Sequence, residues 1–512
     1  MADDQAAGVD HTRVVLGAAT AIFLLVLVRT AWIAEDAFIN FRVVDNFLHG
    51  YGLRWNIAER VQIFTDPLWV LILSAAAFVT REFYYTALAL SFAFTIGALV
   101  VYARVAADRI VAAAGIVVLT TSKAFVDFST SGLEGPLVHF LLACVLFEYW
   151  KTEAPTARTL TRAVALASLC AVARMDTLVL SAPVLAALAW RVGVRSAWRP
   201  VLLGSLPLVA WECFAVLYYG FPFPNTAYAK LGGGIPQAER TVQGGLYLLD
   251  SIERDPVTLV VIVAAMIAPA LTRRSRDWPV SAGLFLLLFY TVRIGGDFMS
   301  GRFLTGGLLC ALMLLTREVR LAGHRALAPL PIALAVVMAA SAHGAVFATD
   351  GRLRDAFIDR ERTVDERRVN YPFTGLMSVS REGAGLTHPW ARQAREILAQ
   401  GRPVVEWGAD GIFGFTVGRE VHIVDSYGLG DAFLARLPAQ RRWYPGHVKR
   451  TLPWGYLETI ATGLNRITDP ALAMYYEQIQ LVTRGRIWSP RRLRAIWRLN
   501  IGSYDNLTTA PR

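Results

Sequence analysis

Two adjacent carboxylates, Glu35 and Asp36, follow the first apolar run of the sequence, in the stretch Trp-Ile-Ala-Glu-Asp-Ala-Phe-Ile-Asn-Phe-Arg that ends at Arg42. Mutual repulsion and partial burial both raise the pKa of a carboxylate. A carboxylate tuned in this way can act as a general base toward a sugar hydroxyl. Asp36 is the first candidate for this base and Glu35 the second. The pair could instead be solvated and cap the next helix.

Other ionisable residues gather in short polar islands at the ends of apolar runs. The islands are residues 55–60, 65–67, 131–136, 174–176, 224–230 and 295–302. Charged groups at such positions are costly to desolvate, so a group of them on one membrane face indicates a functional site. Singly, each has an ordinary explanation: Arg174 and Asp176 could form an ion pair, and Lys230 could extend toward water.

A lipid phosphate leaving group would need a fixed positive partner, which an arginine supplies better than a lysine because its planar fork matches the phosphate oxygens. Nearby carboxylates would stabilise positive charge at the anomeric carbon of a sugar. The candidates on this donor and phosphate side are Arg42, Arg174, Asp176, Asn225, Lys230, Asp297 and Arg302. The candidates for an acceptor or supporting role are Glu59, Arg60, Asp66 and Glu134.

No cofactor is evident in the sequence. Glu35 and Asp36 could hold Mg²⁺ or Ca²⁺ together with water molecules, although the sequence contains no complete loop of oxygen ligands. A divalent cation therefore stays an open alternative.

The elements that would position these residues are membrane helices. Of the 512 residues, 55% are hydrophobic, compared with about 45–50% in ordinary soluble domains. The excess is concentrated before residue 348 in apolar runs. The formal charge is +11, but many basic residues stand in short loops between these runs, which indicates membrane topology and not nucleic-acid binding.

Twelve apolar runs are candidate membrane spans. Four basic loops, within residues 151–162, 191–199, 273–276 and 317–325, are expected on the cytoplasmic side. With the N-terminus also cytoplasmic, this assignment requires one run not to cross, and the short run at 67–79 is the candidate. We therefore expect about eleven spans within a membrane domain of residues 1–347, the last of them at 327–347.

The C-terminal part, residues 348–512, is polar and contains no run long enough to cross a membrane. Residues 403–415 followed by 421–425 predict a strand, a glycine turn, a short helix and a second strand. Helices are expected at 390–400 and 469–484. We expect a soluble α/β domain on the extracytoplasmic (periplasmic) side of the inner (plasma) membrane.

The polar islands resemble those of the GT-C membrane glycosyltransferases, across most of the chain. The resemblance is closest to the terminal arabinofuranosyltransferases of actinobacterial cell-wall arabinan and to the pilin arabinosyltransferases. The stretches that carry it are residues 33–60, 224–230, 295–302 and 425–429. The family usually has an Asp-Asp pair in the first loop, whereas this chain has Glu35-Asp36. Because Asp36 matches the family pattern, the resemblance assigns the catalytic role to Asp36 in preference to Glu35.

The resemblance implies a polyprenyl-phosphate donor similar to decaprenyl-phosphoryl-arabinofuranose and a glycan or glycoprotein acceptor bound with help from the C-terminal domain. In that domain, Asp425, Arg441, His447 and Lys449 match a family-like stretch and could line the acceptor side. A basic patch on anionic lipid would explain them almost as well. A single base would invert the anomeric centre and a carboxylate nucleophile would retain it; both acids are present.

Other functions remain possible at this point. The chain could be a transferase for another sugar such as mannose, or a flippase or transporter of polyprenyl-linked sugar, because buried charges among many spans also fit alternating access. Transporters often contain paired halves, and this sequence shows no such symmetry. A membrane-anchored binding protein would need only one or two spans. The pattern favours the enzyme.

Overall fold

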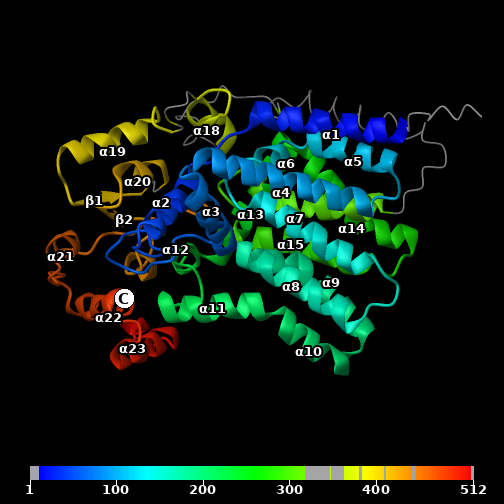
Figure 1. The fold of residues 1–512 in the computed structure, drawn as a ribbon. Helices are drawn as coiled ribbons and strands as arrows, with labels where there is room; N and C mark the ends of the chain where they lie inside the picture. Colours follow the sequence, from blue (N-terminus) through cyan, green and yellow to red (C-terminus); the bar gives the residue numbers. More distant parts are fainter. Residues whose placement is uncertain are drawn as a thin grey trace, which may run out of the picture.

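The computed structural model describes residues 11–317, 346, 363–379, 383, 385–408, 411–440 and 444–508. This part of the chain is mostly helical (Figure 1). The main bundle consists of α1 (His11–Thr30), α4 (Tyr84–Val105), α5 (Arg109–Thr121), α7 (Gly135–Trp150), α8 (Ala157–Ala173), α9 (Leu178–Val192), α10 (Val194–Gly204), α11 (Leu206–Tyr218), α14 (Pro256–Thr272), α15 (Trp278–Ile294) and α16 (Thr305–Thr316).

Hydropathy and length together mark some of these helices as membrane spans. Within the described residues, three segments are long and apolar enough to cross, namely α1, α4 and Met175–Val192, which contains α9. The number rises to five if the bent pairs α10–α11 and α13 (Gln237–Arg254)–α14 each count as one span. Further apolar helices are shorter. The apolar helices agree with a membrane protein, whereas the count of eleven stays a prediction, and its run at 327–347 lies almost entirely outside the described residues.

The described basic loops, together with Arg317, lie at one end of the bundle, toward the right of Figure 1. Arg276 and Arg191 both donate to the carbonyl oxygen of Thr152, at 2.9 and 3.3 Å. Arg317 pairs with Asp277 at 2.8 Å. Loops that are far apart in the sequence therefore share one face, as the charge pattern predicted.

Helix α3 (Pro67–Thr80) begins and ends at the other end of the bundle. Asp66, just before it, accepts a hydrogen bond of 2.7 Å from Asn40 in α2 (Ala37–Leu48). Tyr84, just after it, donates to the carbonyl oxygen of Thr374 at the end of α18 (Glu366–Thr374), at 2.9 Å. Helix α18 packs on the chain that leaves α1, where Tyr371 donates to the carbonyl of Arg29 at 2.5 Å, and the expectation that the run at 67–79 does not cross stays a prediction.

The C-terminal part contains the predicted strand, helix and strand. Strands β1 (Val404–Trp407) and β2 (His422–Asp425) pair in parallel, with α20 (Gly411–Val417) between them in the sequence. The predicted helices at 390–400 and 469–484 are confirmed as α19 (Pro389–Ala399) and α22 (Pro470–Arg484). Strand content is small among the described residues, so the α/β domain with its boundary at 347, which itself lies outside those residues, stays a prediction.

The C-terminal part shares a hydrophobic core with the first loop. Trp55 and the aromatic residues of α2 pack with Phe413 and Ile423. A second core joins Phe433 and Tyr476 to the segment after α11. The remaining helices frame this end of the bundle: α6 (Lys123–Phe128), α12 (Asn225–Leu231), α21 (Tyr456–Thr462) and α23 (Pro490–Asn500).

Candidate functional site

Arg302 is the centre of a charged cluster at the end of the bundle opposite the basic loops. Its Nη2 atom lies 3.0 and 3.2 Å from the two carboxylate oxygens of Glu134. Its Nη1 atom lies 3.7 Å from Oδ2 of Asp297 and 4.0 Å from Oδ2 of Asp36. Four residues from three distant stretches of the chain therefore meet at one point, as the polar islands predicted.

A second arginine, Arg174, holds the far side of Glu134. Its Nη1 atom lies 3.0 Å from Glu134 Oε1, and its Nε atom lies 2.8 Å from Oδ1 of Asp176. Burial alone would raise the pKa of Glu134, but Arg302 and Arg174 outweigh this effect and lower it. Since the fork of Arg174 is occupied by carboxylates, it positions Glu134. The ion-pair alternative for Arg174 and Asp176 is thus confirmed.

A cavity adjoins the two arginines. Glu134, Asp176 and both guanidinium groups line it, together with apolar side chains such as Val138 of α7 and Leu180 of α9. The cavity therefore has charged groups at one side and hydrocarbon at the other.

Asp36 stands at the start of α2 but does not cap it, because its side chain makes no cap hydrogen bond. Its side chain is 30% exposed, facing Arg302. Burial raises its pKa, and the charges of Arg302, Lys230 and His447 oppose that rise. Asp36 therefore faces both cations and the carboxylate of Asp297, and its raised pKa suits a general base.

Glu35 points elsewhere. Its Oε1 atom accepts a hydrogen bond of 2.9 Å from the backbone N–H of Ile412 at the start of α20. Burial, reinforced by the charge of Asp36, raises the pKa of Glu35 to about 8. The two adjacent acids therefore have different surroundings: Asp36 faces the cluster, and Glu35 joins the first loop to the C-terminal part.

The loop at residues 444–447 brings His447 to the cluster. Its ring packs edge-on against Phe298 and Tyr427, with centroids 4.7 and 5.1 Å apart. Burial lowers its pKa, which the charge of Asp36 opposes. A Cβ atom at Gly446 would lie 3.5 Å from Nζ of Lys230, so this loop also covers the end of α12.

Two more predicted carboxylates complete the cluster. Asp66 is buried, and burial together with the charge of Glu134 raises its pKa to about 7. Asp297 is 5% exposed. Its Oδ1 atom accepts a hydrogen bond from the N–H of Phe298 at 2.8 Å, whereas its buried Oδ2 atom has no hydrogen-bond partner among the described residues.

Glu366, at the start of α18, is a carboxylate that the sequence analysis missed. Burial and the charges of Asp36, Glu35 and Asp297 raise its pKa. Its Oε2 atom accepts a hydrogen bond of 2.6 Å from Asn370. No motif surrounds it in the sequence, so only the tertiary structure shows that it faces the acidic pair.

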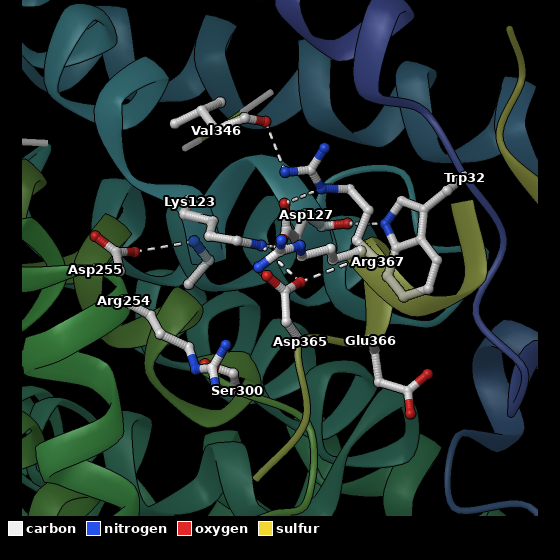
Figure 2. A network of polar contacts seen from close by, with 12 residues as sticks. Trp32, Lys123, Asp127, Arg254, Asp255, Ser300, Val346, Asp365, Glu366 and Arg367 are labelled. Atoms are coloured by element: carbon white, nitrogen blue, oxygen red, sulfur yellow. Dashed lines mark hydrogen bonds and ion pairs between the residues drawn. The ribbon is translucent and has the colours of Figure 1, made fainter. Parts of the chain in front are cut away.

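A buried ion network holds the segment of Glu366 in place (Figure 2). Lys123 bonds both Asp127 and Asp365, the latter at 2.9 Å. Arg367 donates to the other oxygen of Asp127 at 2.6 Å. Figure 2 shows Glu366 directed away from this network.

Backbone hydrogen bonds join the same segment to the loop of Arg302. The N–H of Val364 donates to the carbonyl of Phe298 at 2.6 Å, and the N–H of Ser300 donates to the carbonyl of Val364 at 3.0 Å. The indole of Trp32 donates to the carbonyl of Asp127 at 2.8 Å. The network therefore fixes three cluster segments relative to one another.

Arg42 is not part of the cluster. It is buried at 2% exposure and donates to the backbone carbonyls of Trp55, Gly418 and Val421 at 3.0, 2.8 and 2.9 Å. Its guanidinium also lies 4.6 Å from the centroid of the Trp55 ring. Because these contacts occupy its donors, Arg42 joins α2 to the C-terminal part. This placement gives no support to its expected role as a phosphate ligand.

Further predicted residues support the structure around the site. Asn225 donates to the carbonyls of Gly428 and Leu429 at 2.8 and 3.0 Å. The carboxylate of Asp425 accepts from the N–H groups of Tyr427 and Gly430, at 2.8 and 2.9 Å. These contacts fix the loop after β2, and they give no support to the donor or acceptor contacts expected for the two residues.

The island at residues 55–60 lies apart from the cluster. Glu59 is 3.4 Å from Arg484, and Arg60 donates to the carbonyl of Tyr218 at 3.1 Å. Lys449 is exposed, and the structure gives it no side-chain partner among the described residues. The predicted acceptor contacts of these three residues therefore find no support in their placement, and Arg441 lies outside the described residues.

No family model and no solved structure matches the chain. Over 331 residues the chain is 30% identical to the terminal beta-(1->2)-arabinofuranosyltransferase of Mycobacterium tuberculosis, an alignment that covers 55% of this chain and 51% of that protein. The chain is a relative of these arabinofuranosyltransferases.

A second relative supports the same relationship. The protein of the same name from Corynebacterium glutamicum is 28% identical over 322 residues, which cover 53% of this chain and 46% of that protein. The chain spans about half the length of the curated relatives it matches. The expected resemblance to the terminal arabinofuranosyltransferases is thereby confirmed.

Within the described residues, no group of three or more His, Cys, Asp or Glu side chains is arranged to hold a metal ion. The described part of the chain brings the carboxylate of Asp36 close to the guanidinium of Arg302, beside a cavity with an apolar side. This arrangement can deprotonate a hydroxyl and stabilise a departing phosphate.

Proposed function

We propose that this protein is a glycosyltransferase that moves D-arabinofuranose from a polyprenyl-phosphate donor to a hydroxyl group of a glycan or glycoprotein. The observation that carries the proposal is the approach of Asp36 to Arg302, 4.0 Å apart and within the same cluster as Lys230 and His447. The activity for which the relatives are named, arabinofuranosyl transfer, supports the choice of sugar.

In this mechanism Asp36 takes the proton of the acceptor hydroxyl. The acceptor oxygen then bonds to the anomeric carbon as the bond between that carbon and the phosphate oxygen breaks. The leaving polyprenyl phosphate carries the negative charge, which Arg302 and Lys230 stabilise. A single base acting in this way inverts the anomeric centre.

Glu134 and Asp297 hold Arg302 in the position that the phosphate requires. Glu134 is itself fixed by Arg174, so the guanidinium of Arg302 is oriented before the donor binds. Such preorganisation reduces the cost of aligning the reacting groups. Asp66 and Glu366 extend the acidic side of the cluster toward the sugar.

The donor would enter from the bilayer, with its polyprenyl tail in lipid and its head group in the cluster. The basic loops at the opposite end support a cytoplasmic location for that end. The cluster and residues 348–512 would then face the extracytoplasmic side of the plasma membrane, where the C-terminal part would help to bind the acceptor.

The test is a transfer assay on the purified chain with a synthetic prenyl-phosphoryl arabinofuranose and a short arabinan or glycopeptide acceptor. We expect release of prenyl phosphate and a large loss of rate, about 10²–10⁴-fold, in Asp36→Asn. Asp45→Asn is the matched control, since Asp45 lies on the same helix and pairs with Arg419. Full activity of Asp36→Asn would remove the proposed base, and equal turnover of mannose, glucose and arabinose donors would remove the sugar assignment.

A further inference from the structure

Helix α23, near the C-terminal end of the described chain, has an exposed face with two different strips. Its opposite face is buried through Arg492, Ala495 and Ile496. At 100° per residue, the exposed residues divide into an apolar strip and a neighbouring basic strip. The apolar strip contains Leu493, Trp497 and Ile501, which are 40%, 67% and 57% exposed. The basic strip contains Arg491, Arg494 and Arg498, all exposed.

Arg492 fixes this helix to the end of α11. Its Nη1 atom donates to the carbonyl of Leu217 at 2.8 Å, and its Nη2 atom donates to the carbonyl of Tyr218 at 2.9 Å. These carbonyls belong to the last turn of α11, where intrahelical partners are missing. The position of α23 is therefore set by α11, at the end of the bundle that carries the cluster.

Helix α11 lies on the outside of the bundle (Figure 1). Leu206, Val209 and Phe214 are 53%, 47% and 37% exposed, so its outer surface is apolar and would lie against lipid. Tyr218 and Phe214 stack near its C-terminal end, in the manner of the aromatic residues that mark a membrane interface. Figure 1 shows α23 next to that end of α11 and at the edge of the molecule.

The charge of the segment is strongly one-sided. Residues 478–504 contain six arginines and no acidic residue. Trp488, just before α23, is 72% exposed. Exposed tryptophan beside arginine is the composition of helices that lie in the headgroup layer, because the apolar side chains enter the acyl boundary while the guanidinium groups bond phosphate oxygens.

We infer that the exposed face of α23 docks on the surface of an anionic bilayer, beside the apolar outer surface of α11. The apolar strip enters the acyl boundary, and Arg491, Arg494 and Arg498 bind the headgroup phosphates. This contact anchors the C-terminal part to the leaflet at the cluster end. The inference rests on the membrane location of the bundle and not on the proposed transfer reaction, so the two can fail separately.

The test places a fluorescent probe on the helix in the full-length chain. Leu493→Cys is labelled with bimane in a background of Cys213→Ser and Cys144→Ser, the native cysteines that are not fully buried. The control is Leu464→Cys, which is 59% exposed and follows α21, away from α11. The chain is reconstituted into phosphatidylglycerol vesicles that contain a lipid with a nitroxide near the headgroup.

We expect quenching at residue 493 to exceed that at residue 464 by roughly threefold or more. Quenching at 493 should fall in phosphatidylcholine vesicles, and in the phosphatidylglycerol vesicles the triple variant Arg491→Gln, Arg494→Gln, Arg498→Gln should lower it to that level. Equal quenching at 493 and 464 would overturn the docking. Equal quenching at 493 in both lipids, or no effect of the triple variant, would overturn the role of the arginines. Disulfide-linked dimers through unlabelled Leu493→Cys would instead assign the face to a second copy of the chain.

Discussion

Arg302 binds Glu134 through both carboxylate oxygens, with Nη2 at 3.0 Å from Oε1 and 3.2 Å from Oε2. Glu134 precedes α7 and Arg302 precedes α16, so the pair joins two helices that are distant in the sequence, at the point where Asp36 lies in the cluster. Arg174 bonds the same carboxylate from the other side. The pair therefore fixes the direction of the guanidinium that the proposed phosphate would meet.

Glu134→Gln tests this positioning role. The amide keeps the shape of the side chain but removes the charge that two arginines share, so Arg302 can shift toward Asp297 and Asp36. We expect transfer to fall by about 100-fold, as for a misplacement of about 1 Å near the chemistry. Arg302→Lys should lower the rate to a similar degree, since lysine lacks the planar fork. Wild-type values of kcat/KM in both variants would contradict the positioning role.

The pH dependence of transfer tests Asp36. A base must be ionised, so activity should rise with pH as this carboxyl loses its proton, and its raised pKa moves that rise above the ordinary range. Lys230 opposes the raised pKa of Asp36. Lys230→Met should therefore move the acidic limb of the kcat/KM profile to higher pH, whereas Lys449→Met, a change at an exposed position, should leave it in place. An unmoved limb in Lys230→Met would exclude the proposed electrostatic link.

Glu35 should make the folded state less stable as pH rises. Its pKa is about 8 in the folded chain against an ordinary 4.5, so between these values the folded state holds a proton that the unfolded state has lost. The contribution of Glu35 to the free energy of unfolding is therefore largest at low pH. It declines as the pH rises to about 8 and is constant above that. Glu35→Gln retains the acceptor for Ile412 but cannot ionise, so its thermal midpoint should depend less on pH. If the thermal midpoints of the wild type and of Glu35→Gln changed in parallel with pH, the raised pKa of Glu35 would be refuted.

The ion pairs of Lys123 with Asp127 and Asp365 should stabilise the folded state. Lys123→Met leaves Asp127 and Asp365 buried with fewer cations, which costs about 3–5 kcal/mol in comparable cases. Lys449→Met removes an exposed lysine and should change stability by less than about 0.5 kcal/mol. Thermal unfolding in one detergent compares the two variants. Asp365→Asn added to Lys123→Met should restore part of the loss, and strict additivity would show that the two groups are not coupled.

Much of the architecture followed from local pattern. Hydropathy placed the apolar helices. The two strands and the helix within residues 404–425 were predicted from turn and strand residues alone. These features depend on neighbours along the chain, so a single sequence contains the information.

Only some residues of the charged cluster could be predicted from the sequence. Asp36, Asp297 and Arg302 meet as expected, because polar groups at the ends of helices on one side must share one surface. Arg42 and Arg302 both stand a few residues from an acid, yet only Arg302 contacts the cluster, whereas Arg42 binds backbone carbonyls. Residue type alone did not distinguish Arg42 from Arg302. No pattern in the sequence pointed to Glu366.

The sequence by itself determined that apolar helices carry acidic and basic groups to one end of a bundle, since periodicity and hydropathy act over short distances along the chain. Only the tertiary structure decided which charges pair. Glu134 and Arg302 are 168 residues apart, and an ion pair depends on the distance and burial of its two groups in space, which the packing of α7 against α16 supplies.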